Sequence, residues 1–348
     1  MILIRRRIEP MYLLLVGLLL AGGIFTGCET NPATGNSEFT LLSTGDQRQL
    51  GAQGDAQIVS QFGLYDDPEL AAMVERIGRE VLAHSNDNRF DYQFRVLDTE
   101  VINAFALPGG YIYVTRGLLA YLQNEAQLAM VLGHEVGHVA ANHSAPQYTS
   151  QTLATLGLAV GGAVFEDLAP FLGAAQTGLQ LLFLKYGRDD ETQSDTLGVK
   201  YATLAGYEAA EGAEFFVTLA RLQEQAGAGI PTWASTHPDP IDREENIMTK
   251  AAEWKAAVST ELGGDDPATY LPRLDEMIFG QNPRNGFVSN GIYYHPDLRL
   301  QFAVPSNWQV GNFASQVQMA EPNGAAAAVF TLSAQTSVSG AADAFANS

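Results

Sequence analysis

The chain has 348 residues, of which 46% are hydrophobic and 17% charged, and it carries a formal net charge of −20. This length accommodates one large domain with a smaller one beside it. The acidic excess argues against nucleic-acid binding, because phosphate contacts need clustered Lys and Arg. The single cysteine excludes an internal disulfide.

The first 27 residues have the features of an export signal. Arg5, Arg6 and Arg7 form a basic start, residues 11–25 form an apolar core, and Thr26-Gly27 precede Cys28. This order resembles a bacterial lipoprotein signal peptide, in which Cys28 becomes the lipidated first residue of the mature chain. A simple membrane anchor and ordinary cleavage are the alternatives. All three place the rest of the chain outside the cytoplasm.

The next segments are expected to be a tether, helices and a hairpin. Residues 29–48 are polar and turn-rich, and residues 45–85 carry helical periodicity. Residues 92–97 alternate as in a strand, and residues 103–115 are typical of a hairpin with Pro108-Gly109-Gly110 as its turn. A strand of this hairpin can offer its edge to an extended peptide substrate. The alternative is an internal strand with both edges occupied.

Asn124 is a favourable N-cap for a helix that continues through the segment VLGHEVGHVAANH at 131–143. His134 and His138 are four residues apart, so they project from one helical face and can bind a single Zn²⁺. Glu135 is offset from His134 by about 100°. It can therefore stand beside the metal as the general base of a metallopeptidase.

Three other residues of this helix carry weaker signals. Gly133 and Gly137 each cost about 1 kcal/mol of helix stability relative to Ala, which indicates close backbone packing. His143 is five residues after His138, which on a continuing helix is about 140° off the ligand face. We therefore expect His143 to be a helix-end residue and not a ligand.

A third protein ligand is needed, because a catalytic zinc keeps one position open for water. The candidates open the next helix: Asp189, Asp190, Glu191 and Asp195. Glu191 and Asp195 are four apart, so Glu191 can ligate while Asp195 accepts the outer N–H of a zinc-bound histidine. Asp189 and Asp190 are better placed as helix caps. A solvated acidic helix start is the alternative, and spacing alone leaves the choice open.

The remaining segments are expected to be helical up to about residue 277 and β-rich afterwards. Helices are expected at residues 151–165, 171–184, 192–206 and 209–227. The first two are too short to span a bilayer, which needs about 20 residues, and are interpreted as buried or lid-forming. Strands are expected at 300–304 and 327–332, with a domain boundary near residue 280.

The pattern of His134, Glu135 and His138, followed by Glu191 and Asp195, resembles the zinc metallopeptidases of peptidase family M48. Three further segments, at residues 30–35, 103–118 and 235–238, resemble the exported BepA/LoiP-like branch of that family, which includes HtpX-related gluzincins. The similarity covers roughly residues 30–250. Gln193-Ser194 stand where many relatives have Glu-Ala, and Gly187 stands where Ser is usual. Neither departure is expected to touch the zinc.

The resemblance implies a gluzincin site with one Zn²⁺ per chain. Its ligands would be His134, His138 and Glu191, with Glu135 as the base. His237 is expected at the site, either as a fourth zinc ligand in a resting state or as a donor to the oxyanion. A loop histidine bonded to nearby backbone is the alternative.

Three charged or titratable residues remain. Arg243 is expected to pair with an acid near the cleft. His84 and His295 are interpreted as ordinary surface or packing residues.

We therefore expect an α+β fold in three parts. Residues 1–27 are a lipoprotein signal peptide. Residues 28–280 form a mostly helical gluzincin-type domain with a small sheet flanking the active-site helix. Residues 281–348 form a short β-rich region, whose weak Ala, Ser and Gly tail is compatible with a truncated sequence.

The resemblance implies a zinc-dependent endopeptidase that hydrolyses misfolded or stalled cell-envelope proteins. Its expected partners are unfolded or misassembled envelope proteins, the membrane through the N-terminal lipid, and outer-membrane assembly machinery. Its expected location is the bacterial envelope, facing the periplasm, at the outer membrane in preference to the inner one. The alternatives are a latent protease acting mainly as a chaperone or assembly factor, and a purely structural lipoprotein.

Overall fold

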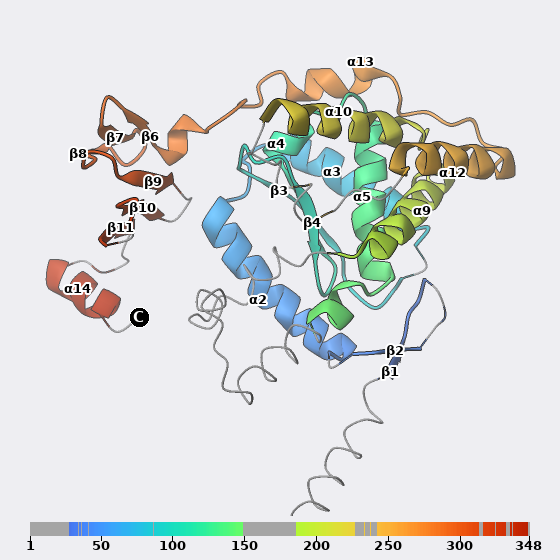
Figure 1. Ribbon diagram of the computed structural model, residues 1–348, viewed down its shortest axis with the longest axis horizontal. Helices are drawn as coiled ribbons and strands as arrows, with labels where there is room; N and C mark the ends of the chain where they lie inside the picture. Colours follow the sequence, from blue (N-terminus) through green and yellow to red (C-terminus); the bar gives the residue numbers. More distant parts are fainter. Residues whose placement is uncertain are drawn as a thin grey trace, which may run out of the picture.

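The computed structural model describes residues 28–33, 35, 37–40, 42–85, 87–148, 186–226, 233, 237, 242–312, 316–323, 325–331, 335 and 337–346. The expected signal peptide at 1–27 and the helices expected at 151–165 and 171–184 lie outside these residues. The described chain has an α+β fold, in which a helical body is followed by a strand-rich region (Figure 1).

The helical body holds both helices and short strands. Its helices are α2 (Thr44–Phe62), α3 (Pro68–Leu82), α4 (Arg116–Leu119), α5 (Glu125–Ala140), α9 (Arg188–Leu204), α10 (Glu211–Ala226), α12 (Arg243–Ala257), α13 (Pro267–Tyr270) and the 3-10 turn η2 (Leu271–Leu274). Its strands are β1 (Cys28–Thr30), β2 (Ser37–Phe39), β3 (Gln93–Leu97), β4 (Ala104–Leu107) and β5 (Tyr111–Thr115). No helix of the described chain is long and apolar enough to cross a membrane.

The segment expected as a tether is more ordered than its composition indicates. Strand β1 pairs antiparallel with β2, and buried Asn31 between them donates to the carbonyl oxygen of Ala141 at 2.6 Å. Ser43 and Asp46 then form a capping box that starts α2. The turn-rich character of the segment is confirmed at Asn31, whose carbonyl accepts from the N–H of Gly35, but β1 and β2 are paired where a tether was expected.

The helical pattern of residues 45–85 divides into two helices. Gly63 has φ of 72°, and Asp67 caps α3 by accepting from the next turn. The periodic apolar residues of α3 are buried, as their spacing predicts: Leu70, Met73, Val74, Ile77 and Val81. The helical periodicity of the sequence predicted which face of α3 is buried, but it did not predict the interruption between α2 and α3.

The small sheet has the order β3-β5-β4, with β3 parallel and β4 antiparallel to β5. The expected hairpin is confirmed. Its turn needs Gly109 and Gly110, whose φ angles are 84° and 88°. A Cβ on Gly109 would lie 2.8 Å from the backbone oxygen of Gln47 on α2. Strand β4 has one strand neighbour among the described residues, so it forms an edge of the sheet.

Helix α5 is the centre of the body, with every residue from Ala126 to Ala140 buried. Asn124 caps it by accepting from the N–H of Gln127, as predicted. The helix lies against α3, α9, α10 and β4, and Figure 1 shows α9 running alongside it. A Cβ on Gly133 would lie 3.0 Å from the carbonyl oxygen of Gly198. The close backbone packing predicted from the two glycines is confirmed, and it fixes α5 against α9.

The change from helices to strands falls between Leu274 and Phe287. The strands form two antiparallel sheets, β6-β7-β8 and β11-β10-β9. They are β6 (Phe287–Ser289), β7 (Ile292–His295), β8 (Leu300–Ala303), β9 (Gln309–Asn312), β10 (Gln316–Ala320) and β11 (Ala327–Thr331), joined to the body by η3 (Pro283–Asn285) and followed by α14 (Val338–Ala346).

The strands expected at 300–304 and 327–332 are confirmed as β8 and β11. Helix α12 lies within the segment expected to be helical, but neither its bounds nor those of the other strands were predicted from the sequence. Figure 1 shows the strand-rich region set to one side of the helical body. Asp98 in the body accepts from Asn282 at 2.6 Å, which ties the two parts together.

Candidate metal centre

Helix α5 presents His134 and His138 one turn apart on the same face. Both side chains are fully buried, and their Nε2 atoms lie 3.0 Å apart. Two imidazole nitrogens this close, in a site without solvent, repel through their lone pairs unless a proton or a cation lies between them. The pair is therefore built to hold a positive charge.

Helix α9 brings Glu191 and Asp195 against this face. One Glu191 oxygen lies 3.3 Å from His138 Nε2, and the other lies 3.4 Å from His134 Nε2. Asp195 accepts from His134 Nδ1 at 2.9 Å. Asp189 is exposed, and Asp190 accepts from the N–H of Gly187 at the start of α9. Only Glu191 of the four candidate carboxylates thus joins the two histidine Nε2 atoms.

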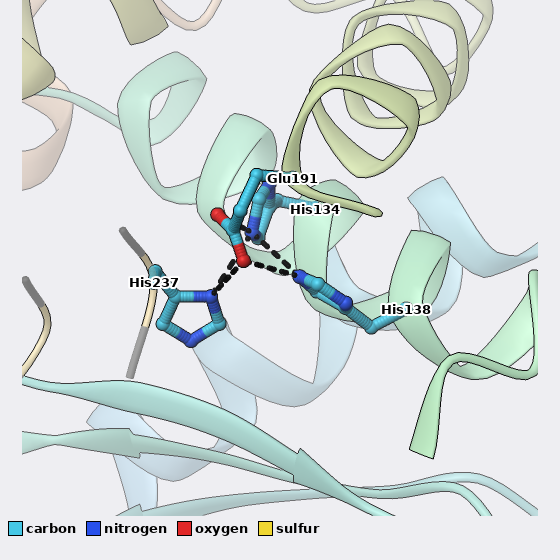
Figure 2. A group of neighbouring side chains, drawn as sticks. All are labelled: His134, His138, Glu191 and His237. Carbon is cyan, nitrogen blue, oxygen red and sulfur yellow. Dashed lines mark hydrogen bonds and ion pairs between the residues drawn. The ribbon is translucent and has the colours of Figure 1, made fainter. Parts of the chain in front are cut away.

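His237 completes the cluster from a segment far along the chain. Its Nδ1 lies 3.0 Å from Glu191 and 3.4 Å from His134 Nε2, and the four side chains point toward a common centre (Figure 2). Trp233 holds this position, because its ring stacks on His237 at 4.3 Å and its carbonyl accepts from the His237 N–H. The alternative of a histidine bonded only to nearby backbone is wrong.

The cluster fits a zinc ion. Four ligand atoms of His134, His138, Glu191 and His237 lie within 4.8 Å of one another. Protein nitrogen and oxygen atoms that bind one zinc ion at about 2.1 Å are similarly close to one another. One Glu191 oxygen is buried without a hydrogen-bond partner among the described residues. Three imidazoles and a carboxylate are also a donor set that zinc prefers.

Glu135 lies beside the cluster, and its carboxylate faces His237 without a hydrogen bond in the described part of the chain. Both of its oxygens are buried and lack a hydrogen-bond partner among the described residues, and the nearer one is 3.6 Å from His237 Nε2. Burial raises the pKa of Glu135, although the neighbouring histidines oppose this. Its carboxylate is therefore more basic than an exposed one and able to take a proton.

The charges of the cluster are strongly coupled. Burial opposes the charged form of His134, but Glu191 and Asp195 outweigh it and raise the pKa of His134 to about 9. Burial also opposes the charged form of Glu191, but His237 and His134 outweigh it and lower its pKa. Burial lowers the pKa of His138. The site therefore keeps one positive charge close to the Glu191 carboxylate, and a bound cation can take the place of that proton.

Arg243 at the start of α12 supports the carboxylates. Its Nη2 lies 2.7 Å from Asp195 and 3.5 Å from Glu191. Its guanidinium lies 3.6 Å from the centre of the Phe216 ring. The expected pairing of Arg243 with an acid of the site is confirmed. This contact helps to hold the Asp195 carboxylate against His134.

Two further contacts with the cluster were not predicted. Tyr186 stacks on the His138 ring at 3.9 Å and bonds Ser144. His143 lies outside the four-ligand cluster, as expected, but its Nδ1 is 2.9 Å from His138 Nδ1. A helix that continued to residue 143 would hold His143 away from the ligand face, whereas α5 ends at Ala140. No local pattern marks Tyr186.

The fold and the cluster together define a metallopeptidase site, with a His-Glu-x-x-His helix and a distant glutamate. Residues 66–251, slightly more than half of the chain, match the family model described as Peptidase family M48. The protein belongs to that family of peptidases.

Similar proteins include beta-barrel assembly-enhancing proteases and a mitochondrial enzyme. The protease of Escherichia coli (strain K12) is 27% identical over 241 residues, which are 66% of this chain and 49% of that protein. That of Yersinia pestis is 29% identical over 259 residues, 70% and 53% respectively. The mitochondrial metalloendopeptidase OMA1 of Schizosaccharomyces pombe is 28% identical over 244 residues, 68% and 70%. The chain thus spans about half the length of the bacterial relatives.

Proposed function

We propose that this protein is a zinc-dependent endopeptidase that hydrolyses misfolded or stalled proteins of the cell envelope. The observation that carries the proposal is the convergence of His134, His138, Glu191 and His237 beside the buried Glu135 carboxylate, which makes no hydrogen bond among the described residues. A buried polar group without a hydrogen bond costs free energy, so a purely structural protein has no use for this arrangement.

In the proposed chemistry, the metal and the side chains of the protein have different roles. Zinc supplies Lewis-acid chemistry, which activates water at neutral pH and polarises a carbonyl. Glu135 takes the proton from the attacking water and delivers it to the leaving amine. Asp195 holds His134 through its Nδ1–H, and Arg243 holds Asp195.

His237 accounts for an inactive resting state of the proposed enzyme. With its Nδ1 among the ligand atoms, it fills the position that the attacking water needs. We propose that the enzyme is latent until the His237 side chain withdraws. This position favours, as a second candidate function, a protease that is silent at rest and acts mainly as a chaperone or assembly factor.

The edge strand β4 supports a broad substrate range. It lies against α5 and has β5 as its one strand neighbour in the described part of the chain. An extended peptide paired with this edge is held by backbone hydrogen bonds, which read little of its sequence. Such binding suits unfolded or misassembled envelope proteins, and the names of the bacterial relatives refer to beta-barrel assembly.

The proposed location is the bacterial envelope, on the periplasmic side and preferably at the outer membrane. The basic and apolar segments before Cys28 support an exported chain attached through a lipid on that cysteine.

The test uses purified full-length protein and unfolded casein. We expect about one zinc per chain, cleavage that stops with a chelator, and loss of zinc in His138→Ala. Glu135→Gln should keep zinc and fold but lose cleavage by about 10²- to 10⁴-fold, since an amide cannot accept the proton. The proposed protease activity would be refuted if the wild-type protein folds without zinc and does not cleave casein. Zinc binding without cleavage, together with suppression of casein aggregation, would favour the chaperone.

A further inference from the structure

The turn that ends α5 brings His143 back onto His138. Asn142 is in the left-handed region, with φ of 58°. Its N–H donates to the carbonyl oxygen of Val139, and the N–H of His143 donates to that of His138, each at 3.0 Å. These two hydrogen bonds form a Schellman motif, a helix C-terminus that usually has Gly in the left-handed position and here has Asn142. In this motif the second residue after the C-cap contacts the last helical turn.

The His143 ring is held on both of its nitrogens. Its Nδ1 lies 2.9 Å from His138 Nδ1, and its Nε2 lies 2.9 Å from Gln193 Oε1 on α9. The hydroxyl of Ser194 is a longer 3.3 Å from the same Nδ1. The ring is 6% exposed, so water competes little for these contacts.

The order of donors follows from the amide oxygen. Gln193 Oε1 can only accept, so the N–H of a neutral His143 ring lies on Nε2. His143 Nδ1 then carries a lone pair and accepts, which makes His138 Nδ1 the donor. The other nitrogen of His138, Nε2, is left with its lone pair facing Glu191 and His134, as a metal ligand requires.

We propose that His143 is a positioning residue that fixes the tautomer and orientation of His138 for metal binding. The inference rests on the proposed function, because the proposed role of His143 requires that His138 binds a metal. His134 receives the same support from Asp195. The two ligands of α5 are thus oriented by different chemistry, one by a carboxylate and the other by a second imidazole.

The first test compares two replacements of His143 in the full-length protein by zinc competition with a chelator. His143→Leu fills similar space but cannot accept from His138 Nδ1–H. We expect it to weaken zinc binding by about 10- to 100-fold. His143→Asn puts an amide oxygen close to the former Nδ1 and should recover most of the affinity. Wild-type affinity in His143→Leu, or equal loss in both variants, would overturn the proposal.

The second test needs no variant of His143, so it remains informative if His143→Leu does not fold. Long-range ¹H–¹⁵N correlation spectra of the zinc-loaded wild type should show the proton of His143 on Nε2 and that of His138 on Nδ1. The opposite tautomer of either ring would overturn the proposal. Ser194→Ala is the matched control, because it removes the longer contact to His143, and it should keep the zinc affinity and both tautomers.

The two tests separate this inference from the proposed function. Wild-type protein that binds no zinc refutes the proposed function and this inference together. Wild-type protein that binds zinc, with a His143→Leu variant that binds it equally well, refutes the positioning role alone.

Discussion

Substitution Gly198→Ala tests how the approach of α9 to α5 builds the metal site. At Gly133 and Gly198 the two helices touch through their backbones. A Cβ on Gly198 would lie 2.9 Å from the backbone nitrogen of His134 and 3.2 Å from the carbonyl carbon of Gly133. Neither backbone atom can rotate away as a side chain does, so the helices must move apart by some tenths of an ångström.

Two opposing effects set the size of the change. Alanine in place of glycine within a helix stabilises the folded state by about 1 kcal/mol, and inserting a methyl group into a packed contact costs about 1–3 kcal/mol. We therefore expect a net loss of stability of up to about 2 kcal/mol. The same movement carries Glu191 and Asp195 on α9 away from His134 on α5, which should weaken zinc binding.

The assay is denaturant unfolding together with zinc competition. Gly45→Ala is the matched control, because Gly45 is exposed in the first turn of α2, where the new Cβ would meet only the Ser43 hydroxyl, at 3.6 Å. The control should be as stable as the wild type or slightly more stable, with unchanged zinc affinity. The reasoning is refuted if Gly198→Ala behaves like this control in both measurements.

Three further predictions concern other parts of the chain. His237→Ala should raise casein cleavage by freeing a ligand position, whereas a large loss would favour the oxyanion donor and no change in rate or zinc affinity would remove His237 from the site. Cys28→Ala should abolish palmitate labelling and move the protein to the soluble fraction, and persistent labelling would contradict lipidation. Asp87→Asn should destabilise the fold by about 1–3 kcal/mol at pH 7. That loss should shrink below about pH 4, since burial raises but Arg89 more strongly lowers the pKa of Asp87, and wild type loses this stabilisation as pH falls through the lowered pKa. Equal losses at pH 7 and pH 3 would contradict the Asp87 argument.

The sequence by itself determined the parts of the site that lie on one helix. The N-cap at Asn124, the spacing of His134 and His138, and the offset of Glu135 all follow from helical geometry, which needs no knowledge of distant contacts. The paired glycines also predicted close packing correctly, since glycine destabilises a helix and its presence there indicates a close contact with a neighbouring backbone. The hairpin at 103–115 was equally local, because its turn chemistry stands in adjacent residues.

The tertiary structure decided everything that depends on where a helix stops or which segments meet. Asp190, Glu191 and Asp195 have similar side chains on one helix start, and only the approach of α9 to α5 puts the Glu191 carboxylate between the two histidine Nε2 atoms. His143 was misplaced because helical periodicity was carried past the left-handed Asn142. Helical spacing describes neighbours along one regular element. It is silent about a turn's handedness and about contacts between segments a hundred residues apart, which packing of the whole core selects.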